Sequence, residues 1–100
     1  MLNINKNKDA DKMTVALEGR LDTTTAPELE ASLKEDIDGV AQLVIDIEKL
    51  EYISSAGLRV LLAAQKMMNR KNGSMKVIHV NEIVQEVFDV TGFSDILTIE

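Results

Sequence analysis

The first third of the chain contains a stretch in which apolar and polar residues alternate. The apolar positions recur at nearly every second residue, at Met13, Val15, Leu17 and Leu21. Because successive side chains of a strand point to opposite faces, this stretch is predicted to be a strand with one buried face. Residues 2–5 are predicted to form a shorter strand and residues 8–11 a turn, so that the two strands make a hairpin.

The apolar period then lengthens to that of a helix, with apolar residues at Ala26, Leu29, Leu33 and Ile37. Thr25 and Glu28 match a capping box, in which the threonine hydroxyl caps backbone N–H groups and the glutamate reaches back to the cap. Pro27 fits the first turn because its missing N–H would have no helical acceptor. Gly39 is predicted to end this element.

A second helix is predicted to begin at Ser54 or Ser55 and to end near Lys71. Asn72 and Gly73 follow it, and Gly73 is expected to adopt the left-handed conformation that commonly ends a helix. Residues 43–47 form a nearly continuous apolar run, which is typical of a central strand covered on both faces and paired in parallel.

Residues 75–80 are predicted to be the next strand, and this range contains the only histidine, His79. Asn81 is a suitable cap for a third helix, which Gly92 ends. The apolar positions of that helix are Ile83, Val84, Val87 and Phe88. The last apolar residues are predicted to form a packing tail or a short strand, and they are Phe93, Ile96, Leu97 and Ile99.

The predicted order is ββαβαβα plus a C-terminal tail, in a single domain over residues 1–100. This order is typical of an α/β fold with a mixed sheet of four to five strands, mostly parallel beyond the first hairpin. The carboxyl ends of the later strands then gather at one edge, where ligand and partner sites of open α/β sheets lie. Three loops are expected to meet there, over residues 22–25, 50–55 and 79–82.

Composition narrows the function classes. The net charge of −6 disfavours nucleic acid and anionic membranes as partners, and the absence of cysteine excludes disulfides and cysteine-based zinc sites. No apolar segment approaches the roughly 20 residues of a membrane span, and the N-terminal residues show no signal sequence. We therefore expect a cytoplasmic protein with no direct membrane insertion.

The residues around Ser55 resemble half of the nucleophile elbow of hydrolases, but they do not complete it. That motif needs glycine two positions before the serine, where this chain has Ile53. No acid lies between Ser55 and His79, so the hydrolase order of serine, acid and histidine is not met. Glycine-rich phosphate loops and a recognisable metal-ligand spacing are also missing. We expect no catalytic residues, no metal site, no cofactor and no enzymatic activity.

Two interpretations of Ser54 and Ser55 remain open from the residues alone. Serine is a preferred helix cap, but one cap accounts for only one of the two. Gly57 costs a helix roughly 1 kcal/mol relative to alanine, which suggests that Ser54, Ser55, Ala56 and Gly57 present a small, flat surface to another protein. A helix N-terminus also stabilises a phosphoryl group, so phosphorylation of a serine could change the outward face without disturbing the fold.

Positive charge is concentrated after these serines. Residues 52–81 contain five cationic side chains and no acidic one. Lys66, Arg70 and Lys71 either complement the dipole of the second helix or present a positive surface to a partner. Arg59 lies near the start of that helix, where the dipole disfavours a cation. We therefore expect Arg59 to have another role, such as contact with a partner or an anion.

Three segments together resemble the STAS domain of bacterial anti-sigma factor antagonists. They are "EGRLDTTTAPEL", "LVIDIEKLEYISSAGLRVLL" and "MKVIHVNEIVQEVFDVTGF", in that order and spacing. The resemblance covers nearly the whole chain and implies a mixed sheet with helices packed mainly on one face. It also implies a protein that binds an anti-sigma factor serine/threonine kinase, is released when the kinase phosphorylates it, and is reset by a metal-dependent serine phosphatase.

At the start of the second helix, the family motif commonly reads Asp-Ser-Ser/Thr-Gly-Leu, with either serine or threonine at the third position. Matched to this chain, Ser54 takes the aspartate position and Ser55 the phosphoacceptor position, with Ser54 as the alternative acceptor. The implied partner-binding residues are Asp22, Thr23, Thr24, Ser54, Ser55, Ala56, Gly57 and Arg59. Because Ser54 brings no carboxylate, an unphosphorylated STAS scaffold, or a cytoplasmic subunit of a lipid-transport or signalling assembly, is the alternative function.

Overall fold

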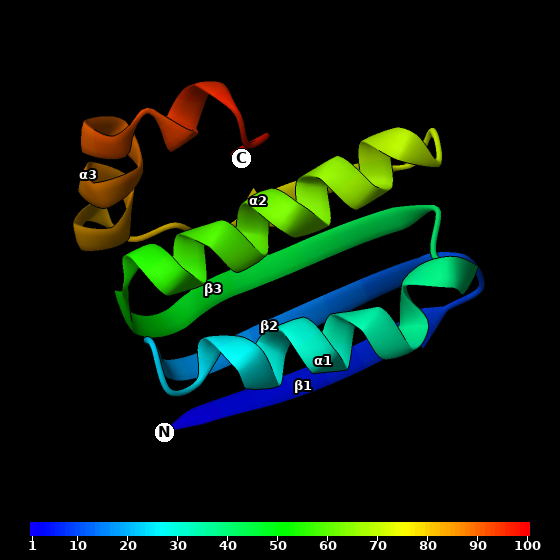
Figure 1. Cartoon of the computed structure of the whole chain (residues 1–100), viewed down its shortest axis with the longest axis horizontal. Coiled ribbons are helices and arrows are strands. Elements are labelled where there is room, and N and C mark those ends of the chain that lie inside the picture. The colour runs from blue at the N-terminus through cyan, green and yellow to red at the C-terminus, as the bar shows by residue number, and fades with distance from the viewer.

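The computed structural model describes all residues, 1–100, and confirms the predicted order of elements (Figure 1). The strands are β1 (Leu2–Asp9), β2 (Lys12–Leu21), β3 (Gln42–Ile53) and β4 (Ser74–Ile78). The helices are α1 (Ala26–Asp36), α2 (Ser55–Arg70) and α3 (Glu82–Thr91), with short 3-10 turns at Ile37–Gly39 and Phe93–Asp95. None of the helices is both long and apolar enough to cross a bilayer.

The four strands form one mixed sheet in the order β1-β2-β3-β4. β1 pairs antiparallel with β2, whereas β3 is parallel to both β2 and β4. Helices α1 and α2 lie side by side over one face of the sheet, and α3 packs near the carboxyl end of β3 (Figure 1). The fold is therefore the predicted α/β arrangement with a mixed sheet and helices mainly on one face.

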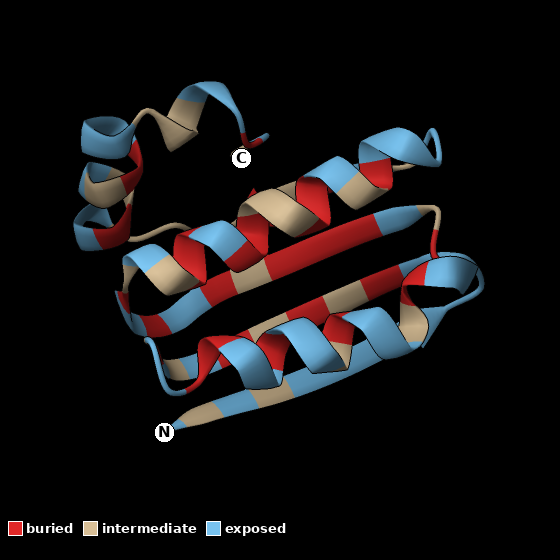
Figure 2. Ribbon diagram, in the orientation of Figure 1, coloured by how far each residue is buried: buried red, intermediate tan, exposed pale blue.

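The core lies between the sheet and the two adjacent helices (Figure 2). Its buried residues in the first half of β2 follow alternate positions. Met13, Val15 and Leu17 of β2 face it together with Ile45 of β3. Side chains on the opposite face are exposed or half-buried, with Val44 as the buried exception. The prediction that β3 is covered on both faces is therefore wrong, because α1 and α2 both pack on the same side.

Two strands are longer than their apolar runs predicted. β1 continues to Asp9 because it pairs with β2 along its whole length, from Leu2 opposite Gly19 to Asp9 opposite Lys12. The hairpin turn is correspondingly tighter, and Ala10 adopts a left-handed φ of 57°. β3 continues to Ile53, so its polar second half is also a strand, held by pairing with β2.

The end of α2 differs from the prediction in one residue. Asn72, and not Gly73, is left-handed, with φ of 60°. Asparagine tolerates this conformation better than most residues because its side chain bonds locally. Gly73 has a different role, because a Cβ there would lie 2.8 Å from the carbonyl oxygen of Ala41 and 2.7 Å from the end of Met68. Glycine thus lets the chain pass close to the start of β3.

The two ends of α3 are as predicted, but the position of His79 before it is not. Asn81 caps α3 as predicted, and its Oδ1 accepts the N–H of Val84 at 2.9 Å. Gly92 ends the helix in the left-handed conformation, with φ of 82°. His79 does not lie inside the strand, because β4 ends at Ile78 and His79 turns the chain with φ of 58°.

The third helix buries only some of its apolar positions. Val84 and Phe88 are buried, whereas the side chain of Ile83 is 69% exposed. The spacing places Ile83 away from the centre of the stripe defined by the other two, so this apolar position lies outside the core. The tail packs in part as predicted, since Leu97 is buried and Ile99 pairs in parallel with Val77 of β4, whereas Ile96 is exposed.

Candidate functional site

The candidate site lies where β2 and β3 end. The N–H of Ser54 donates to the carbonyl of Leu21 at 2.9 Å, which holds the loop after β2 against the start of α2. The third predicted loop also comes close, because Asn81 Nδ2 donates to the carbonyl of Leu50 at 2.9 Å. It lies further back along β3, since β4 pairs only as far as Asp46 opposite Ile78.

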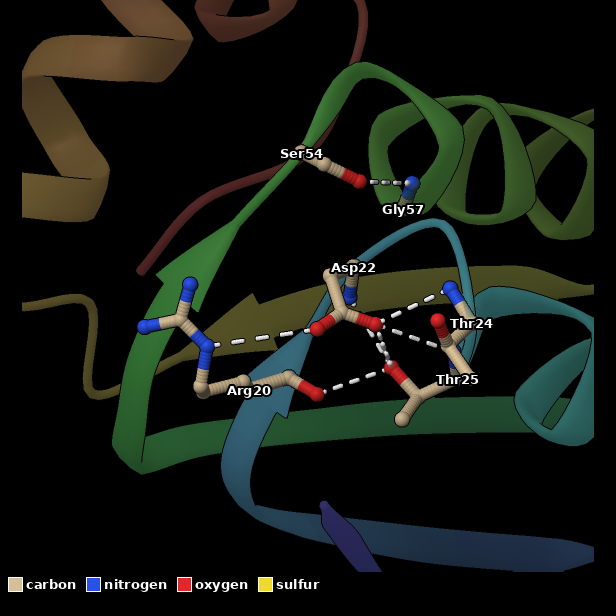
Figure 3. Close-up of polar contacts among 6 residues, drawn as sticks. All are labelled: Arg20, Asp22, Thr24, Thr25, Ser54 and Gly57. Carbon is tan, nitrogen blue, oxygen red and sulfur yellow. Dashed lines mark hydrogen bonds and ion pairs between the residues drawn. The ribbon is translucent and has the colours of Figure 1, made fainter.

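Ser54 and Ser55 have different local structures. Ser54 is half-buried and caps α2, with its Oγ accepting the N–H of Gly57 at 3.3 Å (Figure 3). Ser55 is the first residue of α2 and is exposed, and its hydroxyl makes no hydrogen bond. The N–H groups of Ser55 and Ala56 also have no acceptor within the chain. The cap predicted for Ser54 is thus confirmed, and Ser55 is the freer of the two hydroxyls.

Gly57 is explained by packing inside the molecule. It is buried, and a Cβ there would lie 2.7 Å from Leu21 Cγ and 3.0 Å from Ile53 Cγ1. The glycine lets the first turn of α2 pack against the ends of β2 and β3. The expectation that Gly57 forms part of an exposed flat surface is therefore wrong. Ala56 beside it is half-buried and remains partly accessible.

Asp22 organises the loop after β2. Its Oδ1 accepts the backbone N–H groups of Thr24 at 3.0 Å and Thr25 at 3.1 Å (Figure 3). The bond from the Thr25 N–H, followed by that from Thr24, holds the pKa of the Asp22 carboxyl below its usual 3.8. Because the folded-state pKa is lowered, this carboxylate stabilises the fold above the unfolded pKa, and that contribution is lost as pH falls through the folded value. Asp22 therefore remains charged at neutral pH.

Thr25 does not form the predicted capping box. Its hydroxyl makes no cap bond to α1. Instead, Oγ1 donates to the carbonyl of Arg20 at 2.8 Å and accepts the N–H of Asp22 at 2.9 Å. The side chain turns back because Thr25 itself is helical, with φ of −95° and ψ of −19°, and not in the extended conformation of a cap. Thr25 thus stabilises the site loop and not the helix.

Replacing Thr25 with valine is expected to lower the free energy of unfolding by about 1–3 kcal/mol, because two backbone groups lose their partner in a buried position. Urea unfolding measures the change. Thr24→Val is the matched control, because Thr24 is exposed and its hydroxyl makes no hydrogen bond. Equal effects of the two substitutions would contradict the proposed role of the Thr25 hydroxyl.

Two residues of this region were not anticipated from the sequence. The Arg20 guanidinium lies 4.4 Å from the ring centroid of Tyr52, its partner across β2 and β3. Arg20 Nε is also 3.9 Å from Asp22 Oδ2. The contact between Arg20 and Asp22 could have been predicted from their spacing, because residues two apart along a strand point to the same side.

Cationic side chains gather in a groove between α1 and α2, which follows α2 from Arg59 to its last residue, Arg70. The groove has a volume of about 350 Å³, and its cations are Lys34, Arg59, Lys66 and Arg70. Lys71 lies apart from them and donates to the backbone carbonyls of Ile37 and Asp38. Lys71 was predicted either to complement the dipole of α2 or to face a partner. It instead joins the end of α2 to the turn after α1.

Comparisons with known proteins agree with this fold. A family model described as the STAS domain matches residues 2–100. BtrV of Bordetella bronchiseptica, provisionally named as an anti-sigma factor antagonist, is 37% identical over 91 residues, covering 89% of this chain and 78% of BtrV. The anti-sigma-B factor antagonist of Bacillus subtilis is 30% identical over 98 residues, covering 98% of this chain and 90% of that protein.

Among solved structures, the Bacillus anti-sigma factor antagonist SpoIIAA is similar in both of its forms. The unphosphorylated form has a TM-score of 0.80 at 16% identity and covers 98% of this chain and 87% of its own. The phosphorylated form has a TM-score of 0.79 at 16% identity, with coverage of 98% and 91%. The chain belongs to the STAS domain family, in which these relatives are named as anti-sigma factor antagonists.

Proposed function

We propose that this chain is an anti-sigma factor antagonist that binds an anti-sigma factor serine/threonine kinase and is released when Ser55 is phosphorylated. The observation that carries the proposal is the contrast between the two serines. Ser54 is engaged as the cap of α2, whereas the Ser55 hydroxyl is exposed and unbonded at the first position of the helix. The names of the curated relatives support the antagonist role.

The local structure suits a phosphoryl group on Ser55. The free N–H groups of Ser55 and Ala56 and the positive end of the α2 dipole both stabilise negative charge. A phosphoryl group adds about 1.5–2 negative charges at neutral pH. Modification would therefore leave the fold in place and alter the surface that the partner meets. SpoIIAA, whose two forms match this chain about equally well, is a precedent for such behaviour in a protein of this fold.

The proposed contact surface consists of the site loop and the start of α2. Thr23 and Thr24 are exposed on the loop, and Arg59 is exposed one turn beyond Ser55. Asp22 adds a negative charge beside Ser54 (Figure 3). A phosphoryl group would join this carboxylate on the same surface, and a partner arranged to accept Asp22 would then meet a second, stronger negative charge. Like-charge juxtaposition in an interface costs several kcal/mol.

The test is to incubate the chain with its cognate anti-sigma factor kinase and ATP, and to locate phosphate by mass spectrometry. We expect a single phosphate on Ser55, its loss in Ser55→Ala, and its retention in Ser54→Ala. A metal-dependent serine phosphatase is expected to remove it. Phosphate on other residues only, or none at all, would overturn the switch.

One observation favours an alternative. The position before the acceptor, where the family commonly has aspartate, is Ser54, and its hydroxyl accepts a backbone N–H and offers no carboxylate. A STAS scaffold that is never phosphorylated, or a subunit of a lipid-transport or signalling assembly, would need no such carboxylate. Recovery of transporter subunits and no kinase, when the chain is used as bait, would support this alternative.

A further inference from the structure

Three potential metal ligands converge on the sheet face that α1 and α2 leave uncovered. They are Asp46 and Glu48 of β3 and His79, which follows β4. His79 Nδ1 lies 3.0 Å from Asp46 Oδ1 and 3.8 Å from Glu48 Oε2, and all three ligand atoms lie within 4.8 Å of one another. The two carboxylates thus share one imidazole nitrogen, although His79 is separated from Asp46 by 33 residues.

Two backbone irregularities bring these side chains together. The register between β2 and β3 shifts after Ala16 opposite Asp46 and resumes at Glu18 opposite Lys49, so β3 contains an extra residue. Such a bulge re-aims a side chain, and here Asp46 Oδ1 accepts the N–H of Glu48 at 3.0 Å. The left-handed backbone of His79 turns the chain directly after Ile78, which pairs with Asp46, and leaves the imidazole against the Asp46 carboxylate.

The donor set indicates the class of ion. One imidazole nitrogen with two carboxylate oxygens suits divalent transition metals such as Zn²⁺, whereas Mg²⁺ and Ca²⁺ prefer oxygen ligands alone. Zinc bonds of about 2.0–2.2 Å place neighbouring ligand atoms roughly 3–3.5 Å apart, and the two carboxylate oxygens lie 3.0 Å and 3.8 Å from His79 Nδ1. Three protein ligands would leave coordination positions for water. A hollow of about 260 Å³ borders Asp46 and Glu48, and its other charged and polar lining residues are Asn5, Glu18 and Lys49, whereas His79 lies outside this lining.

We propose that Asp46, Glu48 and His79 form a binding site for a divalent transition-metal ion of the Zn²⁺ class, open to solvent. The proposal stands independently of the phosphorylation switch. A bound ion would join β3 to the turn that precedes α3. Asn81, two residues after His79, both caps α3 and donates to the carbonyl of Leu50. Metal binding is therefore expected to stabilise the attachment of α3 to the sheet.

The test uses the full chain, freed of metal with a chelator and titrated with Zn²⁺ in a calorimeter. We expect one ion per chain, and a loss of affinity of at least about tenfold in His79→Gln and in Asp46→Asn. Glu86→Gln is the control, because it removes an exposed carboxylate of α3 outside the cluster and should leave affinity unchanged. Glutamine at position 79 retains a polar side chain, and circular dichroism verifies that each variant is folded.

Amide NMR provides an independent measurement. Zn²⁺ is expected to shift the resonances of residues 46–48 and 79–82 and not those around Ser55. The absence of saturable binding up to about 1 mM Zn²⁺, the weak end of specific affinities, would overturn the proposal. Binding by His79→Gln as tight as that of the unmodified chain would overturn it equally, because the ion would then be held elsewhere.

Discussion

Ser55→Asp is expected to weaken binding to the cognate anti-sigma factor kinase about a hundredfold. The substitution places a permanent negative charge at the exposed start of α2, next to Ser54, whose N–H donates to the carbonyl of Leu21 just before the ionised Asp22. A hundredfold loss corresponds to about 2.7 kcal/mol, which is within the cost of juxtaposing like charges in an interface. Isothermal titration calorimetry with the nucleotide-bound kinase measures the change.

Two control variants separate charge from shape. Ser55→Asn has nearly the same size as the aspartate variant but no charge, and it is expected to keep most of the affinity. Ser74→Asp adds the same charge at an exposed serine at the start of β4, away from the carboxyl ends of the strands, and is expected to bind normally. Undiminished binding by Ser55→Asp would count against the switch, and equal losses in Ser55→Asp and Ser55→Asn would assign the effect to shape.

Phe88→Ala is expected to lower the free energy of unfolding by about 3–5 kcal/mol, the usual range for a buried aromatic residue. Phe88 is fully buried, and with Val84 it is one of two buried residues through which α3 attaches to the rest of the molecule. Its loss removes one of these two buried anchors and the apolar area that its ring buries. Urea unfolding followed by circular dichroism measures the effect.

The control for this substitution lies two residues further along the same helix. Val90 is 80% exposed, so Val90→Ala is expected to change the free energy of unfolding by less than about 0.5 kcal/mol. Comparable effects at the two positions would show that α3 does not pack through Phe88. A change in Phe88→Ala confined to the signals of α3 would instead show that the helix unfolds separately from the sheet.

Hydrophobic periodicity predicted the order of elements because each element buries a regular stripe. The alternation in β2 and the cap at Asn81 are local features, and both were read correctly. The roles of side chains that act outside their own helix or strand were not predicted correctly. Thr25 was predicted to cap α1, but its hydroxyl bonds backward to Arg20, and His79 was placed in a strand that ends one residue earlier.

The candidate site was predicted only in part, because sequence patterns reveal local features and not contacts made by the folded sheet. A cap at Ser54 follows from residue type and neighbouring sequence, so it was predictable. The burial of Gly57 depends on Leu21 and Ile53, which only the folded sheet brings against α2. The group of Asp46, Glu48 and His79 depends on strand register and on a bulge, neither of which apolar patterning encodes.

The tail that ends in Ile99 has a consequence for the edges of the sheet. Val77 of β4 donates to the carbonyl of Thr98 at 2.8 Å and accepts the N–H of Glu100 at 3.0 Å. These bonds occupy part of the outer edge of β4, which would otherwise offer free backbone groups to another chain. The opposite edge, β1, carries asparagine and lysine along much of its length. Both borders of the sheet therefore discourage the addition of a foreign strand.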